Sequence, residues 1–505
     1  MSKKIYYLLS IVSVFFMSSL NAEQISVNEG LFRTTYESVV LPENEKMGLM
    51  GINYLMTNTM GLYYGIGIYG ALQGERGGFF TGGVELGYTS SIYKDLLLDV
   101  GVFAGGGGGG AAPQGGGLML RPHITLGYDL EDVKLGLGYS KVLFANGDIH
   151  SNQLFLQAEV SFDQVTTDIS DATVLQETLQ HHVLPYNFTW NRHYLALTIE
   201  EYFPFKGTKS TAGKEDIEQI HLVGFEYGSY LNRDWFGFLE AAGAMHGGAG
   251  GYAEVLGGMG YSHSLVRVVD VKVKVSVGAA GGGQVDTGGG LVYKTNLGLT
   301  YTPIDTLNIT TEGGYMGAVN GSFKAYALKL SLGYPLTFLG VGKKSGEIGI
   351  FENITYGEWG FRLVNQFYFP SESLRYNQDD TLVSLIGLKI DRFVTQNIYL
   401  SGQAYAAYTG DVGGYASGLV GIGYRTHEMI KKASFYGEVL GGAGAGGGID
   451  SGSGAIVQPM VGMNYKFTKK LNMQLGVGPL YALTGALKTV VADIGLLYTF
   501  GTIEQ

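Results

Sequence analysis

The stretch Val269-Asp270-Val271-Lys272-Val273-Lys274-Val275-Ser276-Val277-Gly278 alternates between valine and a polar or small residue. Successive side chains of a β-strand point to opposite faces, so this period of two predicts a strand with one apolar face and one polar face. The same alternation runs through residues 117–128 and 291–301. The pattern predicts an all-β chain.

Two glycine markers occur three times along the chain. The first is a Gly-Tyr pair, at Gly87, Gly260 and Gly423. The second is a glycine-rich run, which begins at Gly108, Gly281 and Gly446. Both markers shift by about 173 and then by about 164 residues. Two independent markers with one offset indicate three copies of a unit, and the period is longer than that of solenoid repeats.

Each unit is predicted to contain about eight strands, and the chain about 24. In the first unit they are predicted near residues 31–40, 47–57, 61–72, 80–90, 94–104, 117–128, 132–143 and 152–162. Short connections, such as 57–61, alternate with longer or glycine-rich ones, such as 104–116. This alternation is typical of an antiparallel up-and-down transmembrane barrel, and an even strand number places both termini on the short-turn side.

The composition agrees with a lipid-facing barrel. The chain has no cysteine, which excludes disulfides and thiolate metal sites. Charged residues make up 15%, against roughly 25% in an ordinary soluble protein. Glycine contributes 82 residues, and tyrosine, with 35, outnumbers lysine and arginine together, with 33. The net charge of −11 argues against nucleic acid as a partner.

The N-terminus has the pattern of a secretory signal peptide. Lys3 and Lys4 precede the apolar stretch 5–17, and small residues lead to Ala22. We therefore expect residues 1–22 to be a signal peptide that directs export through the inner membrane. The remaining segments are predicted as repeat 1 (23–163), a linker with a possible short helix (164–184), repeat 2 (185–336), a second linker (337–346) and repeat 3 (347–505).

The final strand, residues 493–500, carries a polar residue, then Gly495, then the aromatic residues Tyr498 and Phe500. It resembles the C-terminal β-signal of Gram-negative outer-membrane β-barrel proteins. The resemblance implies a transmembrane barrel in the cell outer membrane, with outer-membrane lipid and the barrel-assembly machinery as partners. Tyrosines such as Tyr88 and Tyr424 at the short-turn ends agree with a membrane interface.

Polar residues on the small faces of the strands are predicted to point into the barrel. Arginine or lysine on the lipid face would cost roughly 2–4 kcal/mol at mid-membrane. The lumen-facing candidates are Arg121, His123, Asp270, Lys272, Lys274, Lys294, Asn296 and Gln458. Arg121, Lys294 and Gln458 occupy equivalent positions in the three units, so a single barrel would carry them around one lumen.

Glycine-rich segments are predicted at the tips of the outer loops. Representative positions are Gly108, Gly115, Gly282, Gly289, Gly447 and Gly452. Glycine supplies positive φ in hairpin turns, and we interpret these loops as a shared constriction at the outer mouth. Phosphate-loop and dinucleotide motifs are excluded, because the lysine and the helix that they need are missing. A calcium turn at Asp286 or Asp450 remains open; no cofactor or metal site is predicted.

Three functions follow from these features. The leading one is a pore or transport or export channel formed by one barrel of about 24 strands. The alternative is a non-conducting structural or adhesive surface protein made of three tandem eight-stranded barrels or sandwiches, which the long linker 164–184 favours. The third is a lipid- or glycan-modifying enzyme. Ser262-His263-Ser264 supplies residue types for catalysis, but it lies at a short-turn end, so no catalytic residue is predicted.

Overall fold

The computed structural model describes residues 25–181, 187–211, 213, 218–342, 353–376, 381–429 and 431–505. The predicted signal peptide lies outside the described residues. The described part forms 24 strands, a 3-10 turn at Pro42–Asn44 and one α-helix, α2 (Ala172–His181). The predicted all-β fold of 24 antiparallel strands is confirmed.

The strands fall into three consecutive groups of eight. Unit 1 contains β1 (Ile25–Val40), β2 (Lys46–Thr57), β3 (Leu62–Gln73), β4 (Phe80–Tyr93), β5 (Leu96–Gly108), β6 (Met119–Asp129), β7 (Lys134–Phe144) and β8 (His150–Thr167). Unit 2 contains β9 (Phe188–Pro204), β10 (Ile220–Tyr230), β11 (Trp235–His246), β12 (Ala253–Val266), β13 (Val269–Gly281), β14 (Leu291–Ile304), β15 (Leu307–Ala318) and β16 (Lys324–Val341). Unit 3 contains β17 (Thr355–Tyr368), β18 (Val383–Phe393), β19 (Ile398–Thr409), β20 (Ala416–Arg425), β21 (Ala433–Ala445), β22 (Ala455–Lys466), β23 (Leu471–Ala482) and β24 (Lys488–Glu504). Strands therefore extend into both predicted linkers, since β8 ends at Thr167 and β16 at Val341.

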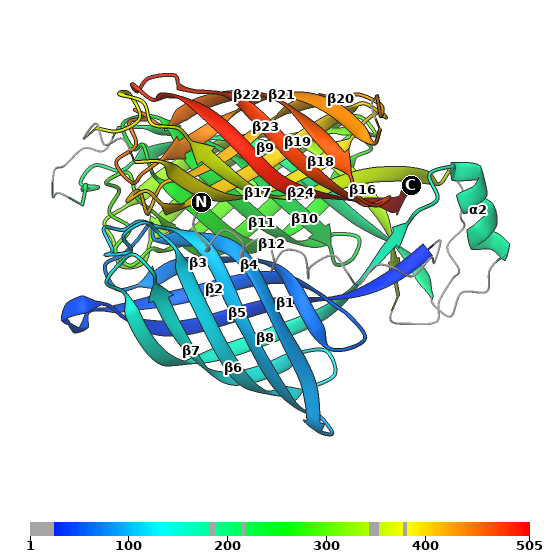
Figure 1. Ribbon diagram of the computed structural model, residues 1–505, viewed down its shortest axis with the longest axis horizontal. Coiled ribbons are helices and arrows are strands. Elements are labelled where there is room, and N and C mark those ends of the chain that lie inside the picture. Colours follow the sequence, from blue (N-terminus) through cyan, green and yellow to red (C-terminus); the bar gives the residue numbers. More distant parts are fainter. Residues whose placement is uncertain are drawn as a thin grey trace.

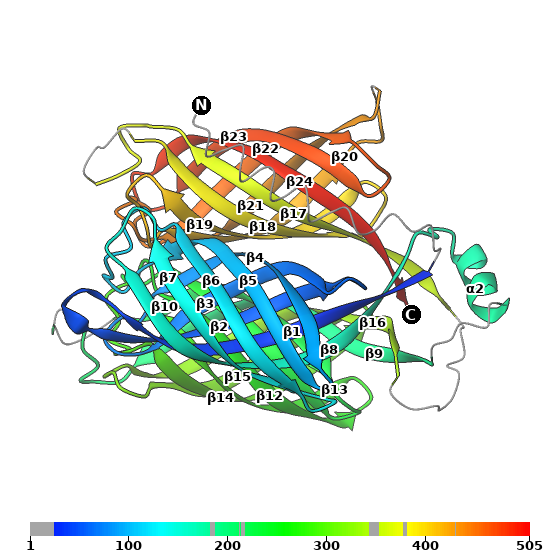
Figure 2. The same cartoon turned by 60° about the horizontal axis from the view of Figure 1, so that its bottom comes forward.

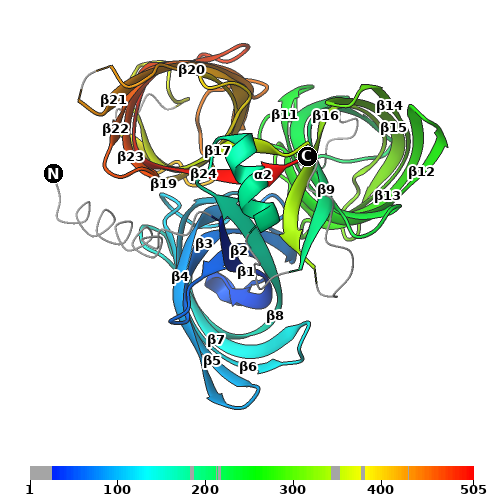
Figure 3. The ribbon, with the colours of Figure 1, turned by 90° about the vertical axis from the view of Figure 1, so that its right-hand side faces the viewer.

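Each unit closes into its own barrel. Within a unit every strand pairs with the next, and the last strand pairs with the first: β1 with β8, β9 with β16, and β17 with β24. Figure 3 shows the three barrels side by side around a common centre. The leading prediction of one large barrel is thus corrected, and the arrangement is the predicted alternative of three eight-stranded barrels. The period-2 pattern is the same for both arrangements and does not specify which strands form the closing seams.

The two ends of the barrels differ. The short turns, such as 58–61 and 94–95, lie at the end that also carries the start of β1, the end of β24 and helix α2; we call it the turn end. The longer connections, such as 109–118 and 282–290, lie at the opposite loop end (Figures 1 and 2). The predicted alternation of connections and the shared side of the termini are both present.

The seam strands extend past the barrels at the turn end and join the units there. Thr167 of β8 pairs with Gly501 of β24, and Phe338 of β16 pairs with Glu504. Leu175 and Leu179 of α2 are buried against this extension. The carboxylate of Asp171 accepts a hydrogen bond from the Thr173 N–H (2.9 Å), which caps the helix. The described part of the first linker therefore carries a short helix that packs on the seam.

The three barrels contact one another in a repeating order. The fifth strand of each unit lies against the third strand of another: β5 against β19, β13 against β3, and β21 against β11. Each contact brings together one glycine and one alanine, in the pairs Gly106–Ala406, Gly70–Ala279 and Gly243–Ala443. Small residues let the two strand backbones approach closely. The arrangement is a pseudo-trimer formed by one chain.

The outer face of the barrels is apolar. In β13, Val273, Val275 and Val277 are about half exposed (48%, 53% and 60%), whereas their neighbour Lys274 is 4% exposed. Tyr88 and Tyr424 are exposed at the turn ends, where we expect a membrane interface. No helix in the described part of the chain is long and apolar enough to cross a bilayer. Outward-facing apolar residues are exposed on strands of all three units.

Candidate functional site

The loop half of each barrel is filled by an apolar core. In barrel 1 this core includes Val39, Met47 and Phe144, which are all fully buried. Equivalent clusters fill barrel 2, around Tyr202 and Phe323, and barrel 3, around Tyr368, Tyr415 and Leu480. An eight-stranded barrel is just wide enough for its own side chains, so these cores close the loop side of each lumen.

A buried charge network fills the next layer of barrel 1. The Arg33 guanidinium donates from Nη1 to Glu85 (2.8 Å), from Nη2 to Asp99 (2.8 Å) and from Nε to Glu159 (2.6 Å). A second arginine, Arg121, donates from Nε to Glu37 at 2.6 Å. Arg33 is 1% exposed, and its guanidinium also lies 4.5 Å from the centroid of the Tyr63 ring. Paired and hydrogen-bonded charges can remain in an interior from which an isolated charge would be excluded.

Barrel 2 uses lysine for the same purpose. The Lys294 ammonium lies 2.6, 2.7 and 3.0 Å from carboxylate oxygens of Glu200, Glu240 and Glu254. These three carboxylates are close enough together to hold a metal ion. Lys294 lies among these carboxylates and pairs with all three, and the Lys329 ammonium lies 2.7 Å from Glu240, so two lysines partly balance the negative charge of the cluster.

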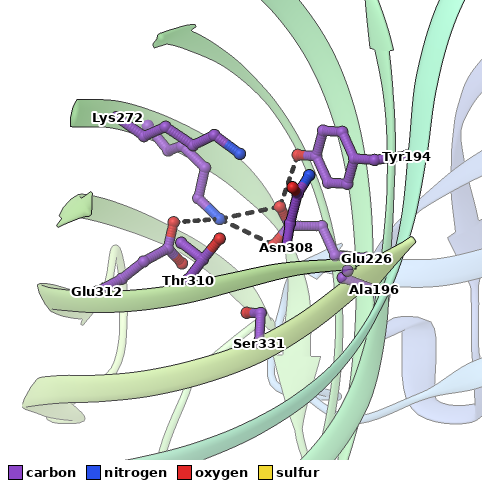
Figure 4. A pocket seen from close by; sticks show the side chains of 10 residues that line it. Tyr194, Ala196, Glu226, Lys272, Asn308, Thr310, Glu312 and Ser331 are labelled. Carbon is purple, nitrogen blue, oxygen red and sulfur yellow. Dashed lines mark hydrogen bonds and ion pairs between the residues drawn. The ribbon is translucent and has the colours of Figure 1, made fainter. Parts of the chain in front are cut away.

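The turn half of barrel 2 is shown in Figure 4. The Lys274 ammonium lies 2.8 Å from Glu226 and 2.7 Å from Glu312, and the Tyr194 hydroxyl donates to Glu226 at 2.7 Å. Lys272 points into the same space, with its ammonium 5.0 Å from the centroid of the Tyr194 ring. The cavity between these side chains measures about 10 Å³, which is room for about one water molecule.

Barrel 3 repeats the arrangement with one arginine and one lysine. Arg362 donates to Asp391 at 2.6 Å and to Glu438 at 3.1 Å. Lys389 lies 2.6 Å from Asp493 and 3.4 Å from Glu438. The three lumens are therefore packed by different side chains to the same effect: each carries an apolar layer and a layer of ion pairs.

The predicted lumen-facing residues lie inside three separate barrels. Arg121 and His123 are buried in barrel 1; Lys272, Lys274, Lys294 and Asn296 in barrel 2; and Gln458 in barrel 3. Asp270 is half-buried at the turn end and accepts a hydrogen bond from Ser264 (2.6 Å). The idea that Arg121, Lys294 and Gln458 share one lumen is corrected, because each belongs to a different closed barrel.

Sequence reasoning missed the carboxylates and the two central arginines of these networks. The missed residues include Arg33, Glu85, Asp99, Glu200, Glu240, Arg362, Asp391 and Glu438. Each lies on the inward face of a strand whose other face is apolar, and some share that face with a second charge, as Arg33 does with Glu37 and Asp391 with Lys389. A charged residue at an inward position is the signal that could have identified them, but the alternation does not reveal which charges meet.

The glycine-rich loops pack between the barrels. The Gly413 N–H donates to the Gly115 carbonyl (3.1 Å) between barrels 3 and 1. The Gly77 N–H donates to the Gly288 carbonyl (2.9 Å) between barrels 1 and 2. A Cβ on Gly289 would lie 2.6 Å from Gln73 of barrel 1. These loops join the three units at the loop end and do not ring a single common pore.

The other predicted glycines lie in the same loop-end region. Gly108, Gly282, Gly447 and Gly452 all have positive φ. A Cβ on Gly282 would lie 2.2 Å from the Gly251 carbonyl oxygen, so only glycine fits at this position. Nearby, Arg76 forms a hydrogen-bonded ion pair with Glu45 at 2.5 Å, which holds the pKa of this guanidinium above its usual value.

The remaining candidates have structural partners. The Asp286 carboxylate accepts the backbone N–H groups of Gly288 (3.2 Å) and Ser322 (3.0 Å), as an ordinary loop cap does. His263 stacks on Tyr261 at the turn end, on the strand face opposite to Ser262. The Ser-His-Ser segment therefore does not converge on one point. In the final strand, Tyr498 and Phe500 stack with ring centroids 6.0 Å apart, next to the seam with β17.

No protein-family model and no curated protein matches the chain. Among solved structures, it is similar to the ferric enterobactin receptor PfeA from Pseudomonas aeruginosa (TM-score 0.28, 11% identity, 95% of this chain and 81% of that one). It is also similar to the siderophore receptor PirA from Acinetobacter baumannii (TM-score 0.27, 10% identity, 94% and 80%). A third is the outer membrane protein opdK from Pseudomonas aeruginosa (TM-score 0.23, 8% identity, 94% and 98%). TM-scores this low do not establish a fold. The fold described above therefore rests on the strand pairing of the chain itself.

Proposed function

We propose that the chain is an outer-membrane protein that displays three closed β-barrels as one rigid body and conducts no solute. The observation that carries this proposal is the packing of the lumens. Each contains an apolar core at the loop end and buried ion pairs below it. The function that this supports best is a structural or adhesive one at the cell surface, without catalysis.

The outer membrane as location is supported by the outer face. Exposed valines and leucines face outward along the strands, and exposed tyrosines lie at the turn ends. In barrels of this type the short turns face the periplasm and the longer loops face outside. In this orientation the interlocked glycine-rich loops lie at the cell surface, and the last strand, β24, is the one that the assembly machinery would read.

The test is conductance of the purified full-length chain in a planar bilayer. We expect no steady conductance steps from inserted protein, because ions would have to displace buried ion pairs. Insertion is checked on the same sample by reduced mobility of the heated chain on a detergent gel and by resistance to added protease. A large, steady conductance would contradict the proposal and support the channel that the sequence predicted.

A further inference from the structure

The turn end of barrel 3 contains a pocket of about 230 Å³. It lies in the mouth of the barrel, between the inward-facing ends of the strands and the turns 426–432 and 467–470. Charged side chains dominate its lining: Glu358, Arg425, Glu428, Lys432, Lys466 and Lys469. We refer to these residues as the basic pocket.

The basic pocket has an excess of positive charge. Arg425 pairs with Glu358 at 2.8 Å, and Lys466 pairs with Glu428 at 2.6 Å. No carboxylate lies within ion-pair distance of Lys432 or Lys469 in the described part of the chain. The two paired cations are neutralised, so two ammonium groups remain to interact with a ligand.

Asn464 provides a second, independent indication of a ligand. Its side chain is 5% exposed, lines the same pocket, and has an amide oxygen without a hydrogen-bond partner among the described residues. Buried amides in native proteins nearly always have partners. A ligand hydroxyl group could donate a hydrogen bond to this oxygen. If the Asn464 amide is flipped, so that its oxygen and nitrogen exchange places, the amide nitrogen would instead donate to a ligand oxygen.

The turn that borders the basic pocket is enlarged in unit 3 compared with the equivalent turns of the other two repeats. The turn between β20 and β21 spans 426–432, whereas the equivalent turns of units 1 and 2 are 94–95 and 267–268. In unit 1 the corresponding turn ends carry Lys94 and Lys134 together with Asp95, Asp129, Glu131 and Asp132, so acidic residues outnumber basic ones there. An enlarged basic turn in one copy is therefore an addition to the barrel and not part of its common packing.

We propose that the basic pocket binds the phosphate group of a small molecule that enters from the turn side of the membrane. A phosphate monoester carries about 1.5 to 2 negative charges at neutral pH, which matches the two unpaired lysines. Lysine binds phosphate as a point charge and does not require bidentate geometry. The pocket is larger than one phosphate ion needs, which leaves space for a small organic group. Because it opens inside the barrel mouth, soluble phosphates reach it more directly than bilayer lipids.

The test is calorimetric titration of the detergent-solubilised full-length chain with inorganic phosphate and, separately, with glycerol phosphate. We expect one site per chain, and at least a tenfold loss of affinity in the double variant Lys432→Gln/Lys469→Gln. A tenfold loss corresponds to about 1.4 kcal/mol. Lys432→Arg/Lys469→Arg should retain binding, because it keeps both charges. The matched control is Lys94→Gln/Lys134→Gln in the turns of barrel 1, which should bind as the natural chain does.

The two probes separate the possible sources of the phosphate. Tighter binding of glycerol phosphate supports an ester ligand whose organic group fills the pocket, and equal binding supports free phosphate. Absence of binding to both probes, or binding that Lys432→Gln/Lys469→Gln leaves unchanged, would overturn the proposal. The measurement uses micelles and no ion flow, so its result is independent of whether the barrels conduct.

Discussion

Buried charges in this protein occur in networks that depend on each member. Arg362 lies between the carboxylates of Asp391 and Glu438, and Trp359 lies on the same strand, β17. Such a network adds little net stability compared with an apolar core, but removal of one partner leaves an unpaired buried charge. The ion pairs therefore make the lumen specific in its packing and intolerant of single substitutions.

We expect Arg362→Met to destabilise the protein by about 3–5 kcal/mol, because Asp391 loses its ion-pair partner in a buried site. Urea unfolding in lipid vesicles, followed by tryptophan fluorescence, measures the change. Adding Asp391→Asn to the same chain should restore part of the loss, since the uncompensated charge is then removed. Arg267→Met, at an exposed turn, is the control and should change stability by less than about 0.5 kcal/mol. Equal effects of the two methionine variants would show that the Arg362 network is not a buried charge cluster.

At the scale of the strand, each element presents one face to lipid and one to the interior. This facing follows from the sequence, because a period of two fixes which residues share a face. The facing continues through two prolines at which the strand pairing is interrupted: the ladder between β6 and β7 has no partner for Pro122, and that between β22 and β23 has none for Pro459. Both prolines lack the N–H that the ladder needs.

We expect Val273→Arg to impair assembly and its neighbour Lys272→Ala to be tolerated. Val273 is 48% exposed on the outer face of β13, where arginine would cost roughly 2–4 kcal/mol near the middle of the membrane. Lys272 points inward and has no carboxylate within ion-pair distance in the described part of the chain. Its removal therefore leaves no buried carboxylate without an ion-pair partner. The folded fraction on an unheated detergent gel measures both variants. A tolerated Val273→Arg together with a defective Lys272→Ala would reverse the assigned faces.

Strand positions, facing and the threefold repeat could be predicted from the sequence because they depend on local alternation and internal similarity. The closing seams could not, since β8 pairs back to β1 through residues such as Gly30 and Phe162 that carry no distinguishing pattern. The ion-pair partners were hidden for the same reason: Arg33 and Glu159 are 126 positions apart. The basic pocket was missed because the lysines of two separate turns are brought together by the pairing of β21 with β22, which the alternation does not reveal.

At the scale of the whole molecule, the three barrels are held by contacts that a single large barrel would not contain. Gly243 of β11 faces Ala443 of β21, and a Cβ on this glycine would lie 3.3 Å from the Ala443 Cβ. These strands belong to different units and are ten strands apart in chain order. The chain has no cysteine of its own, so a disulfide between two introduced cysteines would report on this contact alone.

We expect Gly243→Cys/Ala443→Cys to form a disulfide on export, because the Cβ separation is close to the 3.5–4.5 Å that the bond requires. A protease site placed between β16 and β17 then gives two fragments, which should stay joined on a denaturing gel until reductant is added. Gly313→Cys/Ala443→Cys is the matched control: a Cβ on Gly313 has no atom within 4 Å, so no bond should form. Fragments that separate without reductant, from folded protein whose thiols remain free to alkylation, would contradict the packing of barrel 2 against barrel 3. Joined fragments would exclude one 24-stranded barrel, in which β11 and β21 lie far apart around the wall.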